Sequence, residues 1–344
     1  MADEPAHWYA KQGPLAWALA PAGWAYGAVS ARRMGQKPKY ESRLPVLCIG
    51  NFTAGGAGKT PTALQLGATA KAMDLKPGFL SRGYGGASGS KPTLVDARQH
   101  NVRDVGDEAL LLAGAGPTVV CSDRVAGAQA LEETNVDMII MDDGFQNPAL
   151  AKDFSLVVLD AARAIGNGFV HPAGPMRAPL KPQLARADAL LLIGQSLASA
   201  QVVRVAAKMA KPVMEAKLQV PNAARWRGVK VLSFSGIGSP DKFAHSLASV
   251  GANVVERRDF PDHHAYSLAD CEELLRRASE MNAALVTTAK DKVRLLRMGE
   301  RHTQLHENCH ALGIEMAFDN PKRAIGIIQK TIDAGRARRL KTAV

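Results

Sequence analysis

Short runs of apolar residues without polar alternation recur along the first 200 residues of the chain. Strands of a parallel sheet that is covered on both faces have this pattern, because neither face meets water. Helix-like stretches lie between several of these runs, for example over 61–73 and 126–133. The expected strands are 45–49, 78–80, 118–121, 138–141, 154–159 and 189–193. This alternation predicts an α/β fold, an open parallel sheet with helices on both faces.

A second series of the same kind follows a proline-bearing stretch at 211–221. Its expected strands are 229–234, 253–255 and 284–288, and its expected helices lie near 241–250 and 268–281. A chain of 344 residues is long enough for two cores. We therefore predict an N-terminal segment (1–40), a core domain (41–210), a second, smaller α/β lobe (211–335) and a basic tail (336–344).

The N-terminal segment has an unusual composition. It is apolar over 14–29, and two arginines follow at 32–33. The apolar stretch is too short to cross a membrane comfortably and is interrupted by Pro21 and Gly23. Five of the nine Trp and Tyr residues of the chain lie in this region, namely Trp8, Tyr9, Trp17, Trp24 and Tyr26. Aromatic residues beside a basic flank are typical of a helix in the bilayer interface, and the alternative is a helix packed on its own domain.

Composition narrows the function only partly. The formal net charge is +11, which suits nucleic acid, an anionic membrane or a phosphorylated substrate without separating them. The four cysteines are scattered with no C-x-x-C pair, so neither a zinc site nor a disulfide framework is indicated, and a reducing cytosol fits best.

The segment GNFTAGGAGKTP at 50–61 carries the first clear chemistry. It joins an expected strand to an expected helix, and glycines there let backbone N–H groups point at an anion beside the helix N-terminus. Lys59 then supplies a charge for the outer phosphates and Thr60 a hydroxyl ligand for Mg²⁺. The pattern G-x-x-x-x-G-K-[ST] fails only at its first position, Thr53. The residues expected to bind a nucleoside triphosphate are Thr53, Ala54, Gly55, Gly56, Ala57, Gly58, Lys59, Thr60 and Pro61; the alternative is a tight turn with a chance Gly-Lys-Thr.

A phosphate loop of this type needs a carboxylate at the end of a neighbouring strand to hold the metal. The run that ends at Met141 is followed by Asp142 and Asp143. One of the two can reach Mg²⁺ directly or through water. The alternative is a turn with a helix cap.

Two further polar stretches are candidates for proton transfer. Asp107 and Glu108 precede an apolar helix, where capping is the simpler explanation. Asp262, His263 and His264 lie on a loop of the second lobe. An acid that orients an imidazole is suited to taking a proton from a hydroxyl. The sequence alone does not bring Asp107 to His263, so their pairing stays open at this point.

Nine motifs in order resemble those of the tetraacyldisaccharide 4'-kinases, the lipid A pathway kinases of Gram-negative bacteria. The resemblance runs from about Trp8 to Leu295. The motifs are WYAKQGPLAWALAP…YG, GNFTAGGAGKTP, LSRGYGG, VGDEALLL, DDGFQN, VVLDAARAIGNGFVHPAGPMRAPL, GIGSPDKF, DFPDHHAY and TTAKDKVRL. Each motif is weak by itself, whereas the ordered set is specific.

The resemblance implies transfer of the γ-phosphate of ATP, with Mg²⁺, to the 4'-hydroxyl of tetraacyldisaccharide 1-phosphate, which forms lipid IVA. It implies a P-loop core and a second lobe with the nucleotide between them. It also implies an N-terminal helix that meets the inner membrane at its cytoplasmic face. The expected partners are therefore an acylated disaccharide lipid and the membrane surface, and no nucleic acid.

The motifs also carry residue roles. Asp107 matches the family's catalytic acid residue and His263 its partner in the dyad that activates the sugar hydroxyl. Arg177 matches an arginine at the reacting phosphates, where a guanidinium stabilises developing charge. Further matches are Lys59 and Thr60 for phosphate and metal, Asp142 and Asp143 for metal, with Glu108 as a third candidate ligand, and Asn51, Arg82 and Asp262 near the acceptor.

Three positions depart from the family pattern. Asn147 replaces a histidine after D-D-G-F-Q, Ala178 replaces a glutamate after Arg177, and Ala289 replaces a glutamate in T-T-E-K-D. None of them removes a residue that we assign to phosphoryl transfer.

Two other classes of function remain as alternatives. A P-loop GTPase-like regulator or metallochaperone uses the same loop, but it is expected to carry N/T-K-x-D, and TTAKDKVRL is a poor imitation of that motif. A basic protein that binds membrane or nucleic acid without catalysis needs no nucleotide. Aromatic residues are only 5% of the chain and gather at the N-terminus, so no base-stacking platform is visible.

Overall fold

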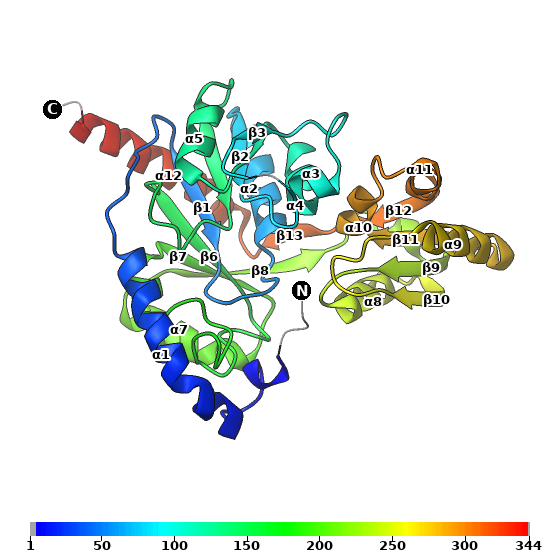
Figure 1. The fold of residues 1–344 in the computed structure, drawn as a ribbon, viewed down its shortest axis with the longest axis horizontal. Coiled ribbons are helices and arrows are strands. Elements are labelled where there is room, and N and C mark those ends of the chain that lie inside the picture. The colour runs from blue at the N-terminus through cyan, green and yellow to red at the C-terminus, as the bar shows by residue number, and fades with distance from the viewer. Residues whose placement is uncertain (1–4, 88, 343–344) are drawn as a thin grey trace.

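The computed structural model describes residues 5–342 except residue 88, and its strands form two sheets (Figure 1). The larger sheet contains β1 (Val46–Gly50), β2 (Pro77–Ser81), β3 (Thr93–Leu94), β4 (Thr118–Val120), β5 (Met138–Asp142), β6 (Phe154–Asp160), β7 (Ala189–Ile193), β8 (Val213–Gln219) and β13 (Glu315–Phe318). Its order is β13-β8-β7-β6-β1-β5-β2-β4-β3. Only the outermost pairs, β13 with β8 and β3 with β4, are antiparallel.

The smaller sheet makes the second lobe. It contains β9 (Lys230–Ser235), β10 (Asn253–Asp259), β11 (Ala284–Thr288) and β12 (Cys309–Leu312), in the order β10-β9-β11-β12, all parallel. The helices of this lobe are α8 (Pro240–Ser249), α9 (Leu268–Met281), α10 (Ala289–Arg294) and α11 (Glu300–Asn308), and a short 3₁₀ turn, η3, spans Ala223–Trp226.

The remaining helices belong with the larger sheet. They are α1 (Pro14–Met34), α2 (Lys59–Ala72), α3 (Val102–Val105), α4 (Asp107–Ala113), α5 (Arg124–Glu132), α6 (Leu180–Arg186), α7 (Ala200–Lys208) and α12 (Pro321–Thr342), with 3₁₀ turns η1 (Ala6–Trp8) and η2 (Leu197–Ser199). The predicted α/β class, a parallel-rich sheet with a second lobe, is confirmed.

Alternate residues of the central strands explain why helices cover both faces. In β1, Val46 and Cys48 join the core that contains α5, α6 and α7, whereas Leu47 and Ile49 join the core that contains α2 and α12. Successive side chains of a strand point to opposite faces, so a fully apolar strand requires two apolar layers. The second lobe has its own core clusters.

The pairing of the strands places the boundary between the two lobes at other residues than the proline-bearing stretch suggested. The segment 211–221, expected as a boundary, contains β8, and β8 pairs with β7 in the larger sheet. The chain then returns from the second lobe through β13 and α12, which packs against the same core as α2. The region expected as a basic tail continues α12 as far as Thr342; residues 343–344 lie outside the described residues, as do residues 1–4 of the N-terminal segment.

The expected N-terminal helix is α1, and it runs without a break through Pro21 and Gly23, which interrupt its apolar sequence. Gly23 lies where the helix meets the loop after β6, and an added Cβ there would come within 2.8 Å of the carbonyl oxygen of Val170. Close packing therefore explains the glycine. Among the described residues, no helix is long and apolar enough to cross a membrane.

Candidate active site

The phosphate-binding loop connects β1 to α2 at the carboxyl edge of the larger sheet. Gly58 caps α2 with φ +84°, and Gly55 has φ +95°, conformations that cost an L-residue about 1–2 kcal/mol. The Asn51 side-chain amide donates to the carbonyl of Gly55 at 3.3 Å, and the Ala54 N–H donates to the carbonyl of Pro175 at 2.8 Å. These two hydrogen bonds therefore hold the loop at Gly55 and at Ala54.

Asp142 is brought to this loop by strand register. It ends β5, which pairs with β1 so that Asp142 lies opposite Ile49, just before the loop. Its Oδ2 accepts a hydrogen bond of 2.9 Å from the Thr60 hydroxyl, and its Oδ1 is buried without a hydrogen-bond partner among the described residues. Burial, together with the charge of Glu108, raises the Asp142 pKa to about 7.

Asp143 has the opposite environment. Both of its oxygens accept from Arg177, at 2.6 and 3.1 Å, and the Lys59 ammonium lies 3.7 Å from Oδ2. Burial by itself would raise the Asp143 pKa, but the charges of Lys59 and Arg177 outweigh it and lower the pKa to about 2. The sheet therefore brings together five of the residues predicted from the phosphate-loop, DDGFQN and GPMRAPL motifs.

The donor set around Thr60 fits Mg²⁺. A hydroxyl and an unsatisfied buried carboxylate oxygen are hard oxygen ligands, and Mg²⁺ usually takes one or two protein carboxylates, with substrate phosphates and water completing its shell. Within the described part of the chain, no group of three or more His, Cys, Asp and Glu side chains is placed to hold a metal ion. Asp142 is the better placed of the two predicted aspartates, because Asp143 is engaged by Arg177 and Lys59.

Asp107 and His263, whose pairing the sequence left open, lie together. Asp107 begins α4 in the first lobe, and His263 lies on the loop before α9 in the second. The His263 Nδ1 is 3.5 Å from Asp107 Oδ2, and its Nε2 is 3.9 Å from Asp262 Oδ2. His263 has φ +58°, and its backbone N–H donates to Asp262 Oδ1 at 3.0 Å. The two lobes thus meet at the predicted acid–histidine pair.

The Asp107 carboxylate is buried and ionised. Burial by itself would raise its pKa, but the hydrogen bond to His263 and the positive charges of Lys290 and Arg294 together lower it well below the usual range. Its side chain is 2% exposed, so this charge is carried almost wholly out of contact with water.

Two basic residues at this junction were not among the predicted site residues. Arg294 of α10 binds Asp107, and Lys290 lies 2.8 Å from the carboxylate of Glu108. Both belong to the motif TTAKDKVRL, which we used only to identify the family. The alternation of basic and acidic residues at the start of a short helix was the available indication. It did not reveal that α10 faces the other lobe.

The remaining predicted residues lie at the edges of this site. Arg82 is exposed. The Arg124 pKa is lowered mainly by burial, and the positive charge of the nearby Arg82 lowers it further. Tyr84 of the same motif places its ring 5.9 Å from the His263 ring. Asn51 is fully buried, and its Oδ1 has no hydrogen-bond partner in the described structure.

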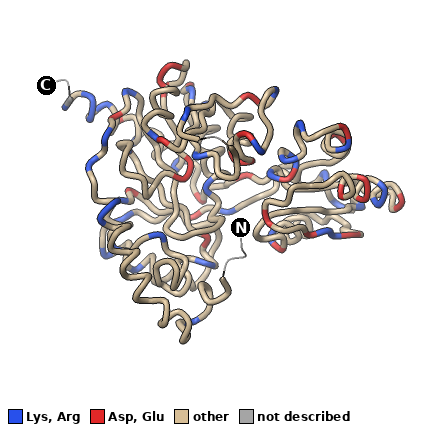
Figure 2. Tube along the Cα trace, in the orientation of Figure 1, with Lys and Arg blue, Asp and Glu red and all other residues tan. Residues whose placement is uncertain are grey.

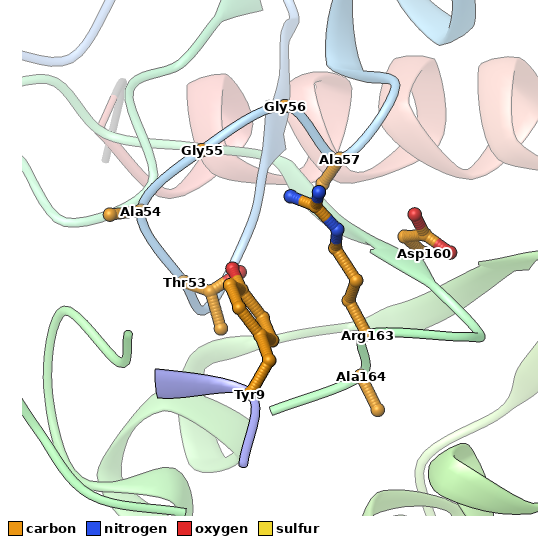
Figure 3. A pocket seen from close by; sticks show the side chains of 9 residues that line it. All are labelled: Tyr9, Thr53, Ala54, Gly55, Gly56, Ala57, Asp160, Arg163 and Ala164. Carbon is orange, nitrogen blue, oxygen red and sulfur yellow. The ribbon is translucent and has the colours of Figure 1, made fainter. Parts of the chain in front are cut away.

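A small pocket opens on the other side of the phosphate loop (Figure 3). Its wall is formed by residues 53–57, and the Arg163 side chain extends from the segment after β6 toward the loop at Ala57. The Arg163 guanidinium lies 5.0 Å from the centre of the Tyr9 ring and donates to the Ser239 hydroxyl of the second lobe at 3.4 Å. Asp160, at the end of β6, pairs with Lys242 of α8. The second lobe therefore contacts the first on both sides of the phosphate loop.

The three residues that depart from the family pattern each lie close to a residue of this site in the chain. Ala178 is fully buried, and its carbonyl accepts from the Gln183 side chain at 2.7 Å. The Asn147 side chain accepts from the backbone N–H of Ala149 at 2.9 Å. Ala289 begins α10, five residues before Arg294.

Comparisons with known proteins agree with one another. The family model described as tetraacyldisaccharide-1-P 4'-kinase matches residues 15–333. A tetraacyldisaccharide 4'-kinase of Sinorhizobium fredii is 47% identical over 341 residues, 99% of this chain and 98% of that protein. The corresponding protein of Rhizobium meliloti is 46% identical with the same coverage.

The fold also has a solved counterpart. A crystal structure of the "apo" form of LpxK from Aquifex aeolicus in complex with ATP matches with a TM-score of 0.70 and 24% identity, over 92% of this chain and 99% of that one.

Proposed function

The chain belongs to the tetraacyldisaccharide-1-P 4'-kinase family, and we propose that the junction of its two lobes is where the γ-phosphate of ATP passes to the 4'-hydroxyl of a tetraacyldisaccharide 1-phosphate. The reaction is that of a phosphotransferase with an alcohol group as acceptor, and it forms lipid IVA in lipid A biosynthesis. The observation that supports this site most strongly is the meeting of Asp107 and His263, from different lobes, beside the Thr60–Asp142 pair.

The phosphate loop and its cations hold the triphosphate. Backbone N–H groups at the N-terminus of α2 and the Lys59 ammonium attract the β- and γ-phosphates. Arg177 is held by Asp143, the carboxylate that Lys59 also contacts, and stabilises charge on the transferred group. Thr60 and Asp142 would hold Mg²⁺. When bound, that ion neutralises negative charge on the phosphate oxygens.

Asp107 and His263 serve the acceptor. The oxygen of the 4'-hydroxyl forms a bond to the γ-phosphorus while the bond from that phosphorus to the β–γ bridging oxygen breaks. The hydroxyl proton passes to the Asp107–His263 pair, in which the pKa of the carboxylate is lowered by His263, Lys290 and Arg294. Interacting groups of this kind titrate as a pair, so the role of base belongs to the pair.

The outer face of α1 supports association with the membrane. Before Met34, which joins the core, its buried residues are small, Ala16, Ala20, Gly23 and Gly27, whereas Leu15, Trp17, Trp24, Tyr26 and Val29 are exposed. Arg32 and Arg33 lie in the last turn of the helix, where Figure 2 shows basic residues gathered. A helix with aromatic residues and a basic end suits the inner leaflet, where its acylated substrate lies. We place the enzyme there as a peripheral protein at the cytoplasmic face.

The test of this function is a transfer assay with a matched pair of lysine variants. Purified protein is mixed with Mg²⁺, γ-labelled ATP and detergent-dispersed tetraacyldisaccharide 1-phosphate, and label in the lipid is measured. Lys59→Ala is expected to lower transfer at least on the order of 100-fold, because Lys59 stabilises the transferred group. Lys71→Ala, at the far end of α2, is expected to keep full transfer. ATP hydrolysis without label in the lipid would instead favour a nucleotide-dependent switch protein.

A further inference from the structure

Arg294 occupies the centre of the lobe junction, yet the reaction described above gives it no part. Its side chain is 4% exposed. The guanidinium donates to a single oxygen, Asp107 Oδ2, through Nε at 3.0 Å and Nη2 at 2.5 Å. Asp107 belongs to the first lobe and Arg294 to the second, so this ion pair crosses the boundary at the proposed proton acceptor.

Residues of the second lobe bind the remaining nitrogen of the Arg294 guanidinium. Nη1 donates to Asp291 Oδ1 at 2.8 Å and to the carbonyl of Gly236. Asp291 is itself held, because its oxygens accept from the N–H of Gly236 at 3.0 Å and from the Thr288 hydroxyl at 2.6 Å. A fully buried carboxylate with this many partners does not move independently of β9 and α10.

Arg294 also touches the histidine. Its Nη2 lies 3.3 Å from His263 Nδ1. The same Nδ1 lies 3.5 Å from Asp107 Oδ2, so the tautomer of the ring decides whether Nδ1 donates to the carboxylate or accepts from the guanidinium. A single side chain therefore contacts both members of the proposed pair and orders them relative to each other.

We infer that Arg294 is a positioning residue for phosphoryl transfer: it holds the Asp107 carboxylate against His263 and links that alignment to the placement of the second lobe. The inference rests on the proposed function. Displacement of a reacting group by about 1 Å can cost on the order of 100-fold in rate, which is the size of effect that such a residue can control. A lysine cannot replace it fully, since one ammonium lacks the fork of donors that reaches Asp107 and Asp291 together.

Steady-state kinetics of Arg294→Gln and Arg294→Lys test the inference. We expect kcat to fall on the order of 100-fold in R294Q and less in R294K, with the KM for ATP nearly unchanged because the phosphate loop is untouched. The matched control is Arg297→Gln. Arg297 donates to the carbonyl of Arg98 across the same lobe boundary without touching Asp107, and full activity is expected. Thermal unfolding shows which variants are folded.

A double-variant comparison separates positioning from a general structural role. If Arg294 acts through Asp107, then R294K adds little to the loss already caused by Asp107→Asn, and D107N/R294K has nearly the kcat of D107N. This comparison uses the charge-preserving variant, so it holds even if R294Q does not fold. Multiplied losses in the double variant, or full kcat in R294K and R294Q, would overturn the inference. Wild-type protein that transfers no label would instead overturn the proposed function.

Discussion

At the scale of single residues, two adjacent carboxylates have been given opposite electrostatic environments. Asp142 faces Thr60 and the charge of Glu108 in a fully buried position, whereas Asp143 lies between Lys59 and Arg177. The raised pKa of the first and the lowered pKa of the second follow from these neighbours. The structure therefore favours Asp142 as the residue that meets Mg²⁺ and Asp143 as the residue that aligns the two cations.

This division predicts the metal dependence of variants. Asp142→Asn is expected to raise the Mg²⁺ concentration needed for half-maximal transfer by about tenfold or more, because a neutral amide is a poorer ligand for a hard cation. The measurement is a Mg²⁺ titration of transfer activity. The control is Asp137→Asn. Asp137 lies just before β5, at the end of the strand away from the site, and accepts a hydrogen bond from the backbone N–H of Lys76. An unchanged titration curve for D142N would assign the metal to another residue.

The sequence predicted a residue's position best where its neighbours in the structure are also its neighbours in the chain. Lys59 and Thr60 follow from a strand, a loop and a helix that are adjacent in the chain, and Asp142 follows from the end of an apolar strand expected in the same sheet. The meeting of Asp107 with His263 came from the family resemblance, because nothing local specifies contact between lobes. Arg294 was missed for the same reason, since its partner lies far away in the chain.

At the scale of elements, α1 reverses the usual arrangement of a surface helix. Small residues face the protein and large apolar ones face outward, so the helix gains close packing on the loop after β6 and leaves aromatic rings exposed. Hydrogen bonds from Gln12 to the carbonyl of Asn167 and from Ser30 to that of Arg177 tie both of its ends to that loop. The same loop carries Arg177, so α1 and the candidate site share one support.

The exposed face of α1 predicts lipid binding. Replacing Trp17 and Trp24 together by Ala is expected to reduce flotation with vesicles of anionic phospholipid several-fold, because each ring contributes apolar area at the interface. Leu268→Ser, an equally exposed apolar residue on α9, is the control and is expected to float like wild type. Equal flotation of the double variant and wild type would argue against α1 as the docking element.

The strands β8 and β13, which the sequence failed to predict, lie at or next to one edge of the larger sheet. The strand β8 alternates buried and exposed residues and stands between two prolines, which made it resemble a linker. Its partner β13 has four residues. β13 is short and β8 is half-exposed, because strands near the edge of a sheet have fewer neighbours or only one covered face. The hydrophobic pattern that predicts a strand is weakest in such strands. Central strands such as β7 were predicted to the residue.

At the scale of the whole molecule, the two lobes have separate cores and meet through several charged pairs, with Val293 of α10 packed on an apolar cluster of the first lobe. The core clusters of the second lobe contain residues of that lobe alone, whereas Asp107–Arg294, Glu108–Lys290 and Asp160–Lys242 cross the boundary. Polar interfaces between domains allow relative motion. Asp107 and His263 therefore come together only when the lobes do, and we expect proton transfer to require that the lobes are closed.

The most direct test of this account compares two acceptors that differ at one oxygen. Wild-type protein is given γ-labelled ATP, Mg²⁺ and either tetraacyldisaccharide 1-phosphate or the same lipid with its 4'-hydroxyl blocked as a methyl ether. The account predicts label on the first lipid and none on the second, because the 4'-oxygen must give up a proton to the Asp107–His263 pair. Label on the blocked lipid, or no label on either while ATP is bound, would contradict it.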